Sequence, residues 1–220
     1  QCSYIAQSQD QSGRFWRSPL RVNNDPTNAF SRDMALGILA YAAKTKDAPT
    51  LERWVAYVRE HDGKMCPVAT DNRCDIFRGI RTLTKIVGNK IGANIDWGNL
   101  SVSSQDAYAA ELYGTIQYGI SGFPLHLGAV QLLILEEVGI TSTYWIDVAR
   151  NALNDRQPNN ALFAHIARRD DLAIKLFLEQ APTGDSVEKD QWSFERVDSE
   201  QAWKSSMDWD YIFLGNLLLR

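Results

Sequence analysis

Carboxylates that lie close to aromatic residues are the most promising chemistry in this sequence. Glu195 follows Trp192 by three residues, and Asp210 directly follows Trp209. An aromatic ring can stack on the apolar face of a sugar, while two carboxyl groups act as acid and base, or as acid and nucleophile, on a glycosidic bond. A neighbouring ring also desolvates a carboxyl group and raises its pKa, which makes that group a usable acid. The pattern favours carbohydrate cleavage.

Asp33 is a third candidate acid–base group, because it follows Arg32 at the start of a predicted helix. Arg32 and Arg196 would orient an anionic group of the substrate through bidentate hydrogen bonds. The candidate platforms for stacking of sugar rings are three tryptophans near the two ends of the chain: Trp16, Trp192 and Trp209.

His126 is the reserve base of this hypothesis. It lies near the start of the most apolar predicted helix, two residues after Pro124. Burial there should lower the pKa of the imidazole, because the charged form loses its hydration. A neutral histidine near pH 7 can accept a proton. A hydrogen-bonded core histidine is the structural alternative.

The candidate acids and tryptophans also have purely structural interpretations. Asp33 would offset the helix dipole, and Glu195 would form a surface pair with Arg196. Trp192 and Trp209 would pin the C-terminal segment to the core. Two functions therefore stay open: a glycan-cleaving enzyme, either hydrolase or lyase, and a non-catalytic helical interaction or structural protein with tryptophan anchors. A small-molecule or lipid-binding pocket around residues 123–138 is a third and weaker possible function.

Motifs for cofactors and metals are absent from the sequence. There is no phosphate-binding glycine loop, no dinucleotide fingerprint and no serine nucleophile elbow. No CxxC or HxxxH pair suggests structural zinc, and the acids near residues 71–75 do not have the spacing of a calcium-binding helix–loop–helix. We therefore expect neither a cofactor nor a metal.

Cys66 and Cys74 lie eight residues apart in a loop-like stretch. This spacing suits a disulfide that closes a small loop in an oxidising compartment, whereas two buried free thiols are the alternative. We expect a secreted or periplasmic protein on this basis. The first residue, Gln1, is not a methionine, which fits a trimmed end and a removed export signal.

The bulk composition excludes several classes of protein. The 220 residues include 27 acids and 23 bases, for a net charge of −4, and 45% are hydrophobic. Such a chain is too apolar to be disordered and too acidic to indicate a nucleic-acid binder. The longest strongly apolar stretch, residues 125–135, is shorter than the ~20 residues of a membrane span. The expected partner is a polysaccharide substrate, and the oligomeric state stays open.

Helical periodicity extends along almost the whole chain, and no segment favours a strand. The sequence predicts a single all-α domain over residues 1–220, with about nine helices arranged as hairpins around a buried central helix. That central helix is 124–138, which is apolar nearly all round. Residues 1–30 are expected to be an irregular segment packed on the domain. Trp54 and Trp145 fall on apolar helix faces and are expected in the core.

The segment at residues 30–37, FSRDMALG, enters a helix from an Asn- and Pro-rich approach. With its tryptophan-rich helical remainder, the chain resembles bacterial α/α-toroid glycan-active enzymes, in which acids and aromatics at helix starts line a central cleft. The resemblance implies activity on a glycan. About nine helices are fewer than a full toroid has, so a partial or different helical array is expected. No catalytic residue is carried over from the family.

Overall fold

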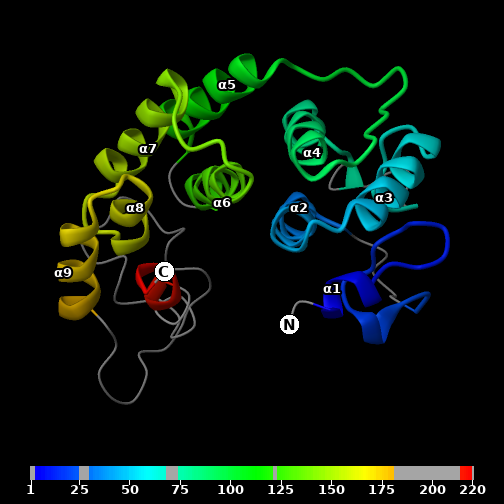
Figure 1. Cartoon of the computed structure of the whole chain (residues 1–220), viewed down its shortest axis with the longest axis horizontal. Coiled ribbons are helices and arrows are strands. Elements are labelled where there is room, and N and C mark those ends of the chain that lie inside the picture. Colours follow the sequence, from blue (N-terminus) through cyan, green and yellow to red (C-terminus); the bar gives the residue numbers. More distant parts are fainter. Residues whose placement is uncertain (1–2, 25–29, 68–73, 121–122, 181–213, 220) are drawn as a thin grey trace. The chain divides into compact units, whose positions relative to one another are not determined.

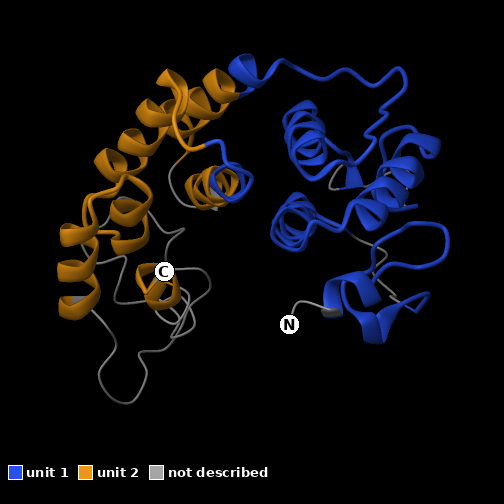
Figure 2. Ribbon diagram, viewed as in Figure 1, with its two compact units in different colours: residues 1–108, 134–140 blue, residues 109–133, 141–220 orange. Residues whose placement is uncertain are grey.

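The computed structural model describes residues 3–24, 30–67, 74–120, 123–180 and 214–219. Within these ranges the fold is all-helical, with nine α-helices, one 3-10 helix and no strand (Figure 1). The predicted fold class is therefore confirmed. The chain divides into two compact units, residues 1–108 with 134–140 and residues 109–133 with 141–220 (Figure 2). We describe each unit by itself, and the single-domain assignment stays a prediction.

The first unit is built around helix α2. Its helices are α1 (Ser3–Gln7), the 3-10 helix η1 (Pro19–Arg21), α2 (Arg32–Thr45), α3 (Ala48–Glu60) and α4 (Arg78–Ile91). Helix α2 packs against α3 and α4. Helix α3 begins where the Asp47 side chain accepts a hydrogen bond from the Thr50 amide, with a proline in the first turn. Trp54 of α3 is fully buried and meets Phe15 edge to face, so it belongs to the core as predicted.

Gly88 does not end α4, although a glycine at that point of the sequence predicts a stop. The helix continues to Ile91 and ends at Gly92, which adopts φ 80° in the left-handed region. Gly88 is required for packing instead, because a Cβ there would lie 2.1 Å from Cγ1 of Ile95. The close approach of Ile95 is a tertiary contact that the local sequence does not reveal.

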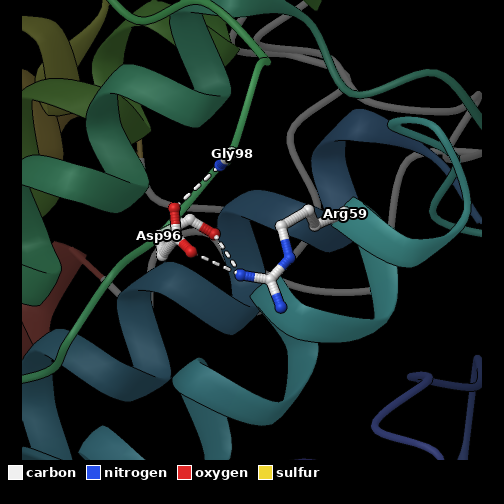
Figure 3. Close-up of polar contacts among 3 residues, drawn as sticks. All are labelled: Arg59, Asp96 and Gly98. Atoms are coloured by element: carbon white, nitrogen blue, oxygen red, sulfur yellow. Dashed lines mark hydrogen bonds and ion pairs between the residues drawn. The ribbon is translucent and has the colours of Figure 1, made fainter.

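The loop that follows α4 is tied to both α3 and α4. The Arg59 guanidinium donates to Oδ2 of Asp96 at 2.6 Å, and Oδ1 of Asp96 accepts from the Gly98 amide at 2.8 Å (Figure 3). The indole of Trp97 is buried and donates to the Arg81 carbonyl at 3.1 Å. The loop is thus tied to the Arg59 side chain of α3 and to the Arg81 carbonyl of α4.

Cys66 and Cys74 form a disulfide, as the sequence predicts, with their Cα atoms 5.4 Å apart. Both residues are fully buried. The Met65 amide donates to the Cys74 carbonyl at 2.7 Å, and Lys64 forms an ion pair with Asp75. The two ends of the loop that the disulfide closes are therefore also joined by a backbone hydrogen bond.

The second unit contains most of α5 (Gln105–Tyr118) and α6 (Phe123–Glu137). It also contains α7 (Tyr144–Arg156), α8 (Ala161–Ile166), α9 (Asp170–Gln180) and a helical turn over 214–218. Helices α7, α8 and α9 pack in succession. Gly128 of α6 lets that helix approach α5 closely, since a Cβ there would lie 2.7 Å from Cγ1 of Ile116.

Helix α6 matches the predicted buried helix. Among its described side chains only Glu136 is exposed, and Leu125, Ala129 and Leu132 have no accessible surface. An apolar sequence on all sides of a helix is typical of such a position. None of the helices in the described part of the chain is both long and apolar enough to cross a membrane.

Most described residues of the 1–30 segment lie outside helices, and α1 and η1 are its two short helical elements. One local expectation needs correction. The sequence predicts Ser103 as the cap of the helix behind it. The Ala107 amide instead donates to the hydroxyl of Ser104, while the Ser103 amide donates to Thr82.

Candidate functional site

A hollow of about 170 Å³ opens in the first unit, beside the N-terminal half of α2. Helix α1, the segment around Trp16 and one face of α2 contribute its walls, which are mostly apolar. The lining residues are Ile5, Ser8, Phe15, Trp16, Arg17, Phe30, Met34, Gly37 and Ile38. Typical ligand pockets measure about 300–1,000 Å³, so this hollow suits a single ring or the end of a chain.

Trp16 is held firmly in the wall of the hollow. Its indole nitrogen donates to Oδ2 of Asp10 at 2.8 Å, and the guanidinium carbon of Arg14 lies 3.6 Å from the ring centroid. Trp16 is only 9% exposed. The arginine covers one face of the ring, so a ligand can reach Trp16 only from the side that lines the hollow.

Asp10 organises the loop that carries Trp16. Burial alone raises the pKa of this carboxyl, but hydrogen bonds from the Ser12 hydroxyl, the Trp16 indole and two backbone amides outweigh burial and lower the pKa. The ionised form is therefore favoured. Asp10 positions the ring, and its oxygens are already engaged by these donors.

Asp33 lies in the first turn of α2 and is half-buried. It is adjacent in sequence to Met34 and one helical turn before Gly37, and both of these residues line the hollow. The N-terminal end of a helix stabilises negative charge. Asp33 is therefore a carboxyl group in the first turn of the helix that forms one wall of the aromatic-lined hollow.

The two arginines near this end of α2 have different surroundings. Arg17 lines the hollow and is exposed. The Arg32 guanidinium carbon instead lies 4.4 Å from the centroid of the Phe77 ring, a cation–π contact. The predicted orienting role of Arg32 thus competes with this contact, whereas Arg17 faces the hollow directly.

His126 lies in the second unit, in the first turn of α6. Burial lowers the pKa of its imidazole, as the sequence predicts, because the charged form is desolvated. The ring is therefore neutral near pH 7. His126 and Asp33 belong to different units, so each is described as a separate candidate.

Five predicted site residues lie outside the described residues: Glu195, Asp210, Arg196, Trp192 and Trp209. Their roles stay predictions. Within the described part of the chain, no group of three or more His, Cys, Asp or Glu side chains is placed to hold a metal ion.

Comparison with known proteins gives no relative for this chain: no family model, no curated protein and no solved structure matches it. The functional argument therefore depends on the residues themselves.

Sequence reasoning missed a group of aromatic residues on the second unit. Trp145 is only half-buried and contacts the rings of Tyr113 and Tyr144. A signal was available, because Tyr144 and Trp145 are adjacent at a helix start. Two neighbouring residues of a helix are about 100° apart around its axis, so they do not share one buried face.

Proposed function

We propose that this protein is a glycan-cleaving enzyme that uses carboxylate chemistry at the hollow beside α2. The observation that carries the proposal is the hollow lined by Trp16 and two phenylalanines, with Asp33 in the first turn of the helix that forms one of its walls. Aromatic walls suit the apolar face of a sugar ring, and an adjacent carboxylate suits glycosidic chemistry. The volume of the hollow fits one sugar residue at the cleavage point rather than a long chain.

The chemical role of Asp33 follows from its surroundings. The N-terminal end of a helix stabilises negative charge, and Asp33 lies in the first turn of α2, so we assign it the role of base or nucleophile. The reaction then needs a second carboxyl group that carries a proton to the leaving oxygen. The sequence offers Glu195 and Asp210 as candidates for that role, because each has a tryptophan nearby in sequence, and both lie outside the described residues. In a lyase reaction, Asp33 would remove the proton beside the sugar carboxylate.

Binding of an anionic sugar is assigned to arginines. Arg17 lines the hollow, and a guanidinium group can bind a sugar carboxylate with two parallel hydrogen bonds. Arg32 and Arg196 are the further candidates from the sequence. This arrangement favours an acidic polysaccharide over a neutral one at the cleavage site.

The proposed location is secreted or periplasmic. The disulfide between Cys66 and Cys74 supports this location, because disulfides persist mainly in oxidising compartments.

A second candidate function is a non-catalytic helical protein with tryptophan anchors. The observation that favours it is the burial of Trp16, Trp54 and Trp97, which are 9%, 0% and 4% exposed. Side chains this deeply buried stabilise a core. In this alternative Asp33 only offsets the helix dipole, and its replacement changes stability but no activity.

Incubation of the purified chain with a panel of acidic and neutral polysaccharides tests the proposal. Wild type should release oligosaccharides from at least one of them, and Asp33→Asn should lower kcat by about 10²–10⁴-fold. Asp106→Asn is the matched control, because Asp106 is also a first-turn acid but belongs to α5. It should keep wild-type activity. Equal activity of Asp33→Asn and wild type would contradict the catalytic role of Asp33.

A further inference from the structure

Four aromatic side chains on the second unit form a continuous row, which we call the aromatic strip: Tyr118, Tyr113, Trp145 and Tyr144. The centroids of Tyr118 and Tyr113 are 6.3 Å apart, those of Tyr113 and Trp145 are 5.6 Å apart, and those of Trp145 and Tyr144 are 4.9 Å apart. The two end members are strongly exposed, Tyr118 at 80% and Tyr144 at 72%. The strip is therefore a chain of touching rings that opens to solvent at both ends.

The backbone beneath the Tyr118 end of the strip is fixed by Arg156. One guanidinium nitrogen of this residue donates to the carbonyls of Ile116, Gln117 and Gly119 at 2.9, 3.1 and 3.1 Å. These carbonyls lie at the end of α5, where no helical partner is available to them. The backbone on both sides of Tyr118 is therefore held by hydrogen bonds from Arg156 of α7.

The Tyr144 end of the strip is fixed by caps at the start of α7. The Thr143 hydroxyl accepts from the Ile146 amide at 3.3 Å, and the Ser142 hydroxyl donates to Asp147 at 2.6 Å. Tyr144 and Trp145 are the first two residues of the helix that these bonds secure. Both ends of the strip thus present exposed rings from a rigid scaffold, which lowers the entropic cost of binding a ligand.

The size of the strip argues against a stable protein partner. A tyrosine offers about 200 Å², so the printed exposures leave roughly 300 Å² on Tyr118 and Tyr144 together. Tyr113 and Trp145 are half-buried and add less than that. A standard protein–protein interface buries about 800 Å² on each partner. The strip is large enough for a short chain of small rings and too small for a folded partner.

The chemistry of the strip favours an uncharged, hydroxyl-rich ligand. The strip contains no Asp, Glu, Lys, Arg or His, and a hydrogen bond with Tyr118, together with partial burial, raises the pKa of Tyr113. A phenol group is both a hydrogen-bond donor and an acceptor. Flat rings offer apolar contact and phenol groups offer hydrogen bonds, a combination that matches the two kinds of surface on a sugar.

We propose that the aromatic strip is a binding surface for a neutral oligosaccharide chain, with sugar rings stacked on Tyr118 and Tyr144. This surface is separate from the hollow beside α2, and it belongs to the other unit. It does not depend on the proposed cleavage. A glycan-binding surface of this kind would retain a polymer on the protein whether or not the protein cleaves it.

Titration calorimetry of the full chain with cellohexaose, xylohexaose, laminarihexaose and mannohexaose tests the inference. At least one hexasaccharide should bind to wild type. Tyr118→Ala and Tyr144→Ala should each weaken that binding about tenfold, equivalent to about 1.4 kcal/mol. Tyr118→Phe and Tyr144→Phe keep the ring and should stay within about threefold of wild type. Tyr4→Ala is the matched control, because Tyr4 is 68% exposed and belongs to the first unit.

Three results would overturn the inference. One is the absence of binding by any of the four hexasaccharides to folded wild type. Another is unchanged affinity in both alanine variants, with thermal melting used to verify that they are folded. The third is binding of phosphocholine, whose quaternary ammonium group aromatic rings also attract, in place of the sugars. Cleavage is measured separately, so loss of binding in Tyr118→Ala supports the strip even where no glycan is cleaved.

Discussion

Removal of the Cys66–Cys74 disulfide should destabilise the protein by an amount that the loop length determines. The two cysteines are eight residues apart, and the loss of loop-closure entropy for such a loop corresponds to about 2.5 kcal/mol at 25 °C. For a chain of this size, that loss lowers Tm by about 5–10 °C. The Cys66→Ala/Cys74→Ala double variant is the perturbation, since alanine introduces no polar group into a site where both cysteines are fully buried.

Chemical denaturation of wild type and the double variant, each with and without a reducing agent, measures this effect. Reduction should destabilise wild type by about the same amount as the double substitution, and it should leave the double variant unchanged. Thiol titration of unfolded Cys2→Ser protein gives an independent result, because no free thiol should be found. Two free thiols, or a reduced protein as stable as the oxidised one, would refute the disulfide and weaken the argument for an oxidising compartment.

Two further predictions concern packing and pH. Gly88→Ala should lower the free energy of unfolding by about 1–3 kcal/mol, because the new Cβ would collide with Ile95. Gly114→Ala should raise it by about 0.4–1 kcal/mol, since nothing lies within 4 Å of the added Cβ. Equal effects of the two substitutions in urea melts would refute this account of Gly88. Because the pKa of His126 is lowered in the folded protein, the unfolded chain binds a proton at this residue more readily. The contribution of His126 to the free energy of unfolding is therefore complete above pH 6.5. It is lost as the pH falls below that value, by at most about 1.4 kcal/mol per pH unit. The His126→Leu variant should lack this part of the pH dependence, and identical pH profiles for the two proteins would contradict it.

Features of the fold that arise from short-range sequence were predicted well. The cap of α7 is one example: the sequence allows Thr141 or Thr143 as the cap, and the Thr143 hydroxyl accepts from the amide three residues further on. The helical periodicity and the Cys66–Cys74 spacing are others. Each of these signals needs only the local chain, so one sequence is enough to detect it.

Features that depend on contacts between distant segments were not predicted. Gly88 looks like a helix stop until Ile95 is seen packed against it. Trp16 looks like an open platform, but Asp10 and Arg14 hold its ring almost completely buried. In each case the deciding partner is a side chain whose position the sequence alone does not give.

The exposure of the aromatic strip also could not be predicted from the sequence. Helical periodicity predicts that Trp145 belongs to the core, yet Trp145 and its neighbour Tyr113 are each half-buried and in contact with a strongly exposed tyrosine. Periodicity assigns a residue to a face of its own helix, but it does not say whether a neighbouring helix covers that face. The surface that we assign to oligosaccharide binding therefore became visible only in the structure.

The central claim, cleavage of a glycan, is tested most directly by mass spectrometry of the polysaccharide digest in water labelled with heavy oxygen. Hydrolysis places one labelled oxygen on each new reducing end, and a lyase reaction instead gives unsaturated products without label. Wild type should give one of these two product classes, and Asp33→Asn should give neither in the same time. An intact polysaccharide after incubation with folded wild type, across the whole panel, would contradict the claim and favour the non-catalytic alternative.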